Sequence, residues 1–236
     1  MVTQLDSAKT ALLEEAAELA GSSGQGGDTV GEAVINRYYR HVTLDDLAER
    51  SPADLLGAVR SGAELAAQRP QGTAKIRVLT PNAEDGWGTG RNRRSVVEIV
   101  TDDMPFLVDS VTAELSRRGH GIHLIVHPVL AVDRDVAGNL RGVYDLDPES
   151  APAGATVESW MHIEIDRQSV DPAHVSALEA DLRRVLRDVR EAVEDWPKMK
   201  NATLGAANAL DGEQGTAAQA AGLGFEELSE IGRAHV

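Results

Sequence analysis

The chain has 236 residues, with 23 Lys and Arg against 38 Asp and Glu, so its formal net charge is −15. Proteins that bind nucleic acid present clustered positive charge, and this balance excludes such a partner. The sequence contains no apolar run of about 18 residues that could cross a membrane, and its first residues show no signal-peptide pattern. The absence of cysteine excludes disulfides and thiolate chemistry. We therefore expect a cytoplasmic protein.

The first two stretches of the chain are predicted to be helical. Residues 1–20 place apolar side chains at helical spacing, and a Gly- and Ser-rich linker follows over 21–27. Residues 28–72 are typical of short helices, with N-cap candidates at Asp28, Thr43 and Ser51, the last followed by proline. We expect an N-terminal helix and linker over 1–27 and a helical segment over 28–72.

Strand patterns dominate the third stretch, residues 73–200. Strands are predicted over 75–79, 95–101, 122–132 and 157–166, with a further candidate near 140–144. One helix is predicted over 106–118, and a second begins after Asp171 with apolar residues at three-and-four spacing. The glycine-rich segment 81–92 joins two strands and opens no helix, so it lacks the element order of a dinucleotide-binding fingerprint.

The element order predicts an α+β fold. Strand, strand, helix, strand, strand, helix suits a mainly antiparallel sheet with helices on one face, here preceded by the short helical segment. The fourth stretch, residues 201–236, is rich in Ala and Gly, whereas seven of the eight aromatic residues lie between positions 38 and 196. We therefore place the folded core before this tail.

Two adjacent carboxylates, Asp102 and Asp103, end one predicted strand directly before a predicted helix. Either carboxylate could cap that helix, and Pro105 fits its first turn. Alternatively, the loop and the helix N-terminus form a pocket for a small molecule or an anion. Both interpretations are open, and we take Asp102, Asp103, Pro105 and Phe106 as a candidate effector or coupling loop.

Histidines on the later strands suggest a polar sheet face. Strand alternation places His123 and His127 on one side of their strand, and Trp160, His162 and Glu164 on one side of another. If the strands pair as expected, these five residues share a face opposite the helix-covered one. We predict no metal site, because residues four apart on a strand are roughly 13 Å apart. The face could be solvated, could dock another domain or subunit, or could hold a catalytic site.

Several segments, taken together, resemble one enzyme family. The longest are VEIVTDDMPFLVDSVTAELSRRG at 97–119 and IHLIVHP at 122–128, and shorter ones lie at 38–39, 69–73, 159–162 and 195–199. Over roughly residues 28–200 the chain is similar to the N-terminal region of the large bacterial NAD-specific glutamate dehydrogenases.

The resemblance implies a fold and a role. It implies that residues 73–200 form an ACT-like, ferredoxin-like βαββαβ module, in which a glycine of the first turn lets an amino acid approach the backbone. Phe106 replaces that glycine here, which implies a structural or coupling role. The parent enzyme would convert L-glutamate, NAD⁺ and water to 2-oxoglutarate, ammonium and NADH. Its catalytic and NAD-binding parts would lie downstream, so we expect neither catalytic nor cofactor-binding residues in this chain.

The resemblance also implies partners and an alternative. We expect a regulatory or assembly fragment that contacts other domains and subunits of a homo-oligomeric enzyme, with an amino acid as a candidate effector. The alternative is a stand-alone ACT module that senses amino acids.

Residues from about 230 to the end look like translated sequencing adaptor, which predicts that the gene continues beyond residue 229.

Overall fold

The computed structural model describes residues 2–22, 30–82, 85–90, 93–168 and 171–212. Its internal contacts divide the chain into two compact units, residues 1–187 and residues 188–236, which we describe separately. The N-cap candidate Asp28 and the proposed adaptor residues lie outside the described residues.

Four helices open the first unit. They are α1 (Val2–Ser22), α2 (Glu32–Tyr38), α3 (Leu44–Leu47) and α4 (Pro52–Ala66). Two of the predicted helix starts are confirmed. The Thr43 side chain accepts a hydrogen bond from the Asp46 amide, and Ser51 forms a reciprocal capping box with Asp54. Local sequence therefore fixes where α3 and α4 begin.

A six-stranded antiparallel sheet forms the centre of this unit. Its strands are β1 (Lys75–Leu79), β2 (Ser95–Asp102), β3 (Ile122–Val126), β4 (Val129–Arg134), β5 (Leu140–Val143) and β6 (Thr156–Ile165). The order is β1-β2-β6-β4-β5, and β3 also pairs with β6. The strand predicted over 122–132 is in fact two strands, separated by His127 and Pro128. Proline has no amide hydrogen for the ladder, which explains the break.

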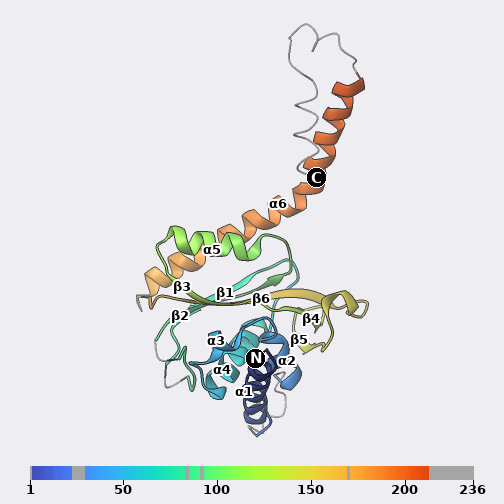
Figure 1. Cartoon of the computed structure of the whole chain (residues 1–236). Helices are drawn as coiled ribbons and strands as arrows, with labels where there is room; N and C mark the ends of the chain where they lie inside the picture. Colours follow the sequence, from blue (N-terminus) through green and yellow to red (C-terminus); the bar gives the residue numbers. More distant parts are fainter. Residues whose placement is uncertain (1, 23–29, 83–84, 91–92, 169–170, 213–236) are drawn as a thin grey trace. The chain divides into compact units, whose positions relative to one another are not determined.

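Helices cover both faces of the sheet (Figure 1). Helix α5 (Leu107–Arg117) and the first part of α6 (Pro172–Gly212) lie on one face, as predicted. The helical layer α1–α4 lies on the opposite face. The α+β class, the antiparallel sheet and the helices α5 and α6 on one face are confirmed, and the preceding helical segment, for which the sequence predicted no position, covers the other face.

Each face of the sheet has its own apolar core. On the α5 and α6 side, buried residues of β2 and β6 face the apolar stripe Leu178, Leu182 and Leu186. On the other side, a cluster of buried residues joins the helical layer to β2, β3, β4 and β6. This second core contains Tyr38, Tyr39 and Trp160. The helical segment and the sheet therefore fold as one body.

The second unit contains the last part of α6. This helix continues past residue 200, the end predicted for the third stretch, and it contains Pro197. Trp196 and Met199 are exposed there. Over the described residues, no helix is both long enough and apolar enough to span a bilayer.

Candidate functional site

The two adjacent carboxylates at the end of β2 point to opposite faces of the sheet. Asp102 accepts hydrogen bonds from Arg69 Nη2 at 2.8 Å and from the Gly72 amide at 2.9 Å. It thereby ties β2 to the segment that follows α4. Asp103 lies on the other side of the sheet, near His127. Burial raises the pKa of Asp103, and the positive potential of His127 opposes that shift.

Neither carboxylate caps α5, so that prediction is wrong. The helix begins at Leu107, its N-cap residue is Phe106, and no side chain caps it. Pro105 lies in the turn before the helix rather than in its first helical turn. Asp102 cannot serve as a cap because Arg69 and Gly72 hold it on the other face.

Phe106 adopts a backbone conformation that normally belongs to glycine. Its φ is 68° and its ψ is 4°, the left-handed region, and it is the sole non-glycine residue with positive φ among the described residues. Its side chain is 66% exposed. The ring therefore does not fill a site within this unit; it points away from the packed core.

The five residues predicted to share one polar face do not share it. In the register of β3 with β6, Val126 lies opposite His162 and Leu124 lies opposite Glu164. Paired residues point to the same side, so His162 and Glu164 share a face with apolar residues of β3, not with His123 and His127. A bulge between Ile122 and Leu124 shifts the register of β3 against β6 by one residue, and this contributes to the difference.

The face that carries Trp160, His162 and Glu164 is buried beneath the helical layer. These three side chains are only 1–3% exposed. Our docking prediction assumed an open polar face, and the structure shows instead that helices of the same chain occupy it. The carboxylates on this face are balanced by arginines from the segments that follow α3 and α4, from the residue before β2, and from strands β1 and β4.

Glu164 is the centre of one buried charge cluster. Its Oε1 accepts from Arg50 Nη2 at 2.6 Å, and its Oε2 accepts from Arg94 Nη1 at 3.1 Å. His162 Nε2 lies 3.9 Å from the same carboxylate. Burial acts to raise the pKa of Glu164, but His162 and Arg50 outweigh it and lower the pKa to about 2. The carboxylate is therefore ionised at neutral pH.

Glu158 is the centre of a second buried cluster. Arg69 and Arg134 both donate to its carboxylate, at 2.6 Å and 2.5 Å, and the Trp160 indole N–H donates at 2.9 Å. Burial acts to raise the pKa of Glu158, but these hydrogen bonds lower it on balance. Together the two clusters fix how the helical layer sits on the sheet.

His127 takes part in a hydrogen bond on the α5 side of the sheet. Its Nε2 lies 2.6 Å from Ser159 Oγ, and burial lowers the pKa of the ring while the nearby Asp103 carboxylate opposes that effect. The set has the residue types of a hydrolytic triad, but Ser159 is fully buried and no substrate could reach it. His123 bonds to Asp166 instead, at 2.7 Å. Among the described residues, no cluster of histidine and carboxylate side chains is placed to bind a metal ion.

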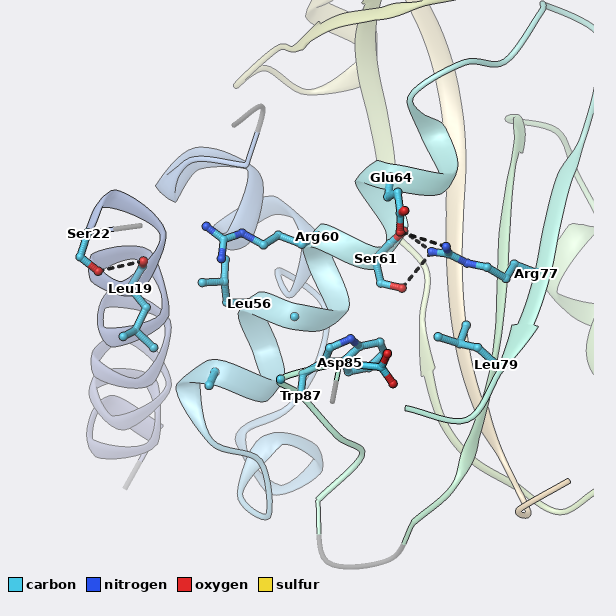
Figure 2. Close-up of a pocket in the computed structure, with 13 residues that line it drawn as sticks. Leu19, Ser22, Leu56, Arg60, Ser61, Glu64, Arg77, Leu79, Asp85 and Trp87 are labelled. Atoms are coloured by element: carbon cyan, nitrogen blue, oxygen red, sulfur yellow. Dashed lines mark hydrogen bonds and ion pairs between the residues drawn. The ribbon is translucent and has the colours of Figure 1, made fainter. Parts of the chain in front are cut away.

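A cleft lies where the sequence predicted no site. It has a volume of about 680 Å³ and lies between α1, α4, β1 and the loop after β1 (Figure 2). Its polar lining comes mainly from Arg60, Ser61, Glu64, Arg77 and Asp85, and Trp87 forms an indole wall. A volume of this size suits a small organic molecule.

Sequence reasoning missed this cleft because its residues come from four separate elements. Arg60 and Glu64 had no distinguishing local pattern, and Arg77 belonged to a predicted strand. The one usable signal was Trp87, a large aromatic residue between two glycines of a loop. We rejected that loop as a nucleotide motif without considering it as the wall of a different site.

Residues 34–182 match a protein family described as "Glutamate dehydrogenase, ACT1 domain". That match spans more than half of the chain. The chain belongs to this glutamate dehydrogenase ACT1 family. The resemblance on segments 97–119 and 122–128 is thereby confirmed, and an ACT domain fits the observed α+β sheet.

Three relatives are NAD-specific glutamate dehydrogenases. The chain is 42% identical to the protein of Halomonas elongata over 69% of its own length. It is 35% identical to that of Pseudomonas aeruginosa over 70%, and 28% identical to that of Mycobacterium tuberculosis over 71%. In each case the match covers 10% of the relative. The chain thus matches about a tenth of the length of each of these relatives.

Proposed function

We propose that this chain is an N-terminal regulatory and assembly region of a large cytoplasmic NAD-dependent glutamate dehydrogenase. The parent reaction would be oxidation of L-glutamate to 2-oxoglutarate and ammonium with reduction of NAD⁺. The supporting observation is that NAD-specific glutamate dehydrogenases match this chain over only a tenth of their length. Catalysis and NAD binding are then the work of other parts of the parent polypeptide.

The candidate coupling loop supports a role in contacts with those other parts. Phe106 combines a left-handed backbone with a ring that is 66% exposed at the start of α5. Such a conformation costs of order 1–2 kcal/mol in a residue with a side chain. An exposed aromatic ring gains most when a partner covers it. We assign this loop to a contact with another domain or subunit of a homo-oligomeric parent enzyme.

The test compares the 236-residue chain with the full-length parent polypeptide. With L-glutamate and NAD⁺, we expect NADH formation from the parent and none from the chain. In the parent, Phe106→Ser is expected to alter assembly in analytical ultracentrifugation or the rate of NADH formation. Val136→Ser, which replaces another exposed apolar residue, serves as the matched control.

The proposal would be overturned if the chain proved to be an amino-acid sensor. Calorimetry of the chain with the twenty amino acids would then show micromolar binding that Asp103→Asn abolishes. NADH formation by the 236-residue chain alone would contradict the proposal as well. If Phe106→Ser leaves both the assembly and the rate of NADH formation unchanged, this loop has no coupling role.

A further inference from the structure

We propose that the cleft in Figure 2 binds a small planar ring that carries an anionic group, a carboxylate or a phosphate. The ring would lie against Trp87, and the anionic group would bind Arg77. This inference is independent of the proposed function, because it concerns binding to this chain alone.

The first support is the way the fold holds the Trp87 side chain. The indole lies directly on α4 at Gly57, where an added Cβ would come within 2.3 Å of the Trp87 side chain. A glycine inside a helix destabilises that helix relative to alanine. The glycine thus allows the indole to lie directly against the helix backbone, where any larger residue would displace it.

The loop that carries Trp87 is also anchored directly after the indole, at Gly88 and Gly90. The Gly88 amide donates to Asp54 Oδ1 at 2.7 Å, and Asp54 is itself part of the α4 capping box. At Gly90, with φ of +75°, the backbone passes so close to the Glu49 carbonyl that an added Cβ would lie at 2.9 Å. The indole is therefore held in place before any ligand arrives, which reduces the entropic cost of stacking.

The second support is the arrangement around Arg77. Its Nε and Nη2 donate to Glu98 Oε2 at 2.9 Å and 2.8 Å, and Nη2 also donates to the Ser61 carbonyl at 2.6 Å. Glu98 is 1% exposed, so this side of the guanidinium is fixed by a buried carboxylate. The remaining nitrogen, Nη1, faces the cleft and donates to Glu64 at 3.0 Å.

The Glu64 carboxylate is an exchangeable partner. Its side chain is 75% exposed, and exposed ion pairs contribute little to stability. A ligand carboxylate or phosphate could replace Glu64 on Nη1 at little cost, while Glu98 keeps the guanidinium in place. The planar fork of arginine favours such an anion. Arg60 adds a second positive charge to the lining.

Two probes separate the sources of the anionic group. Adenosine 5′-monophosphate supplies ring and phosphate, and indole-3-acetate supplies ring and carboxylate. Adenosine and inorganic phosphate supply the ring or the anion alone. Calorimetry on the 236-residue chain is expected to show binding of at least one of the two complete probes, with Kd on the order of 100 μM, and weaker binding of adenosine and phosphate.

Four variants place the binding in this cleft. Trp87→Leu and Gly57→Ala should each weaken binding about tenfold, the second by displacing the indole while leaving a good helix former in α4. Arg77→Lys keeps a charge beside Glu98 but loses the fork, and should weaken binding about tenfold. Glu64→Gln removes the competing carboxylate and should tighten binding about threefold.

Matched controls guard against general effects of substitution. Trp196→Leu and Arg183→Lys replace exposed residues of the same types, and binding should not change. The proposal is overturned if neither complete probe binds at millimolar concentration. It is also overturned if Glu64→Gln weakens binding, or if the four variants bind as the controls do. Binding that Asp103→Asn abolishes and Trp87→Leu leaves intact would locate the ligand at the β2–α5 loop instead.

Discussion

Arg69 Nη2 lies 2.6 Å from Glu158 Oε1, and both side chains are fully buried. Arg69 follows the C-terminal end of α4, whereas Glu158 belongs to β6 at the centre of the sheet. The pair therefore links the helical layer to the sheet across the buried interface. Removing Arg69 would leave the buried Glu158 carboxylate with Arg134 alone of its two arginines, so part of its charge would lose compensation in a dry environment.

Loss of this arginine should destabilise the whole first unit. We expect Arg69→Met to lower the free energy of unfolding by about 3–5 kcal/mol, because Glu158 and Asp102 lose a buried counter-ion. Urea denaturation followed by circular dichroism measures the change. Arg183→Met is the control, since Arg183 is half exposed in its pair with Glu179 and its loss should cost less than about 1 kcal/mol. Equal effects of the two substitutions would contradict the argument.

Phe106 should be a site where glycine stabilises the fold. Phe106→Gly relieves the left-handed strain and removes a ring that is 66% exposed, so little packing is lost. Glycine also has greater entropy in the unfolded chain, which offsets part of this gain. We therefore expect the free energy of unfolding to rise by about 0.5–1 kcal/mol. Phe106→Ala keeps the Cβ and the strain, and should give no gain. Thermal unfolding of the two variants distinguishes them.

Acid should weaken the Glu164 cluster in a defined pH window. The folded-state pKa is about 2, below the ordinary glutamate value of 4.5, so the folded state favours the ionised carboxylate. The resulting stabilisation, on the order of 3 kcal/mol, is present above pH 4.5 and is lost as the pH falls towards 2. Glu164→Gln should remove this part of the pH dependence. Denaturation curves at pH 6, 4 and 3 test the prediction. It fails if the variant and the unsubstituted 236-residue chain lose stability in parallel.

His127 should produce a pH dependence near neutrality. Burial lowers its pKa in the folded state, so the unfolded chain binds the proton more readily. The neutral His127 ring therefore makes its full contribution to folding stability above about pH 6.5. That contribution decreases as the pH falls through the folded-state pKa. We expect His127→Gln to flatten the stability profile between pH 7 and 5. NMR titration of the His127 ring gives the pKa directly, and a value above 6.5 would refute this.

The two acceptors at the start of α4 have separable roles. Ser51→Ala and Asp54→Ala should each cost about 1 kcal/mol by weakening the capping box. Only Asp54→Ala also releases the Gly88 amide, which Asp54 Oδ1 holds at 2.7 Å. Tryptophan fluorescence of Asp54→Ala should therefore shift towards that of an exposed indole, whereas Ser51→Ala should leave the spectrum unchanged. A shift in both variants would assign the effect to the helix itself.

The sequence by itself determined the features that depend on neighbouring residues. The helix starts at Thr43 and Ser51 follow from side chains that reach amides three residues away. The strands over 75–79, 95–101 and 157–166 follow from β-branched residues and alternation. The family resemblance on 97–119 also required only local sequence, and the ACT1 match over 34–182 confirms it.

Tertiary structure alone decided which faces and which side chains meet. Alternation along a strand gives two faces but does not tell which faces of two strands coincide, because a shift of one residue in register exchanges them. The pairing of Val126 with His162 therefore separates His123 and His127 from Trp160, His162 and Glu164, which lie under the helical layer. Likewise, Trp87 and Arg77 become neighbours in one cleft only after β1, α4 and the loop are packed together. Contacts between residues far apart in sequence depend on that packing, and no local pattern encodes them.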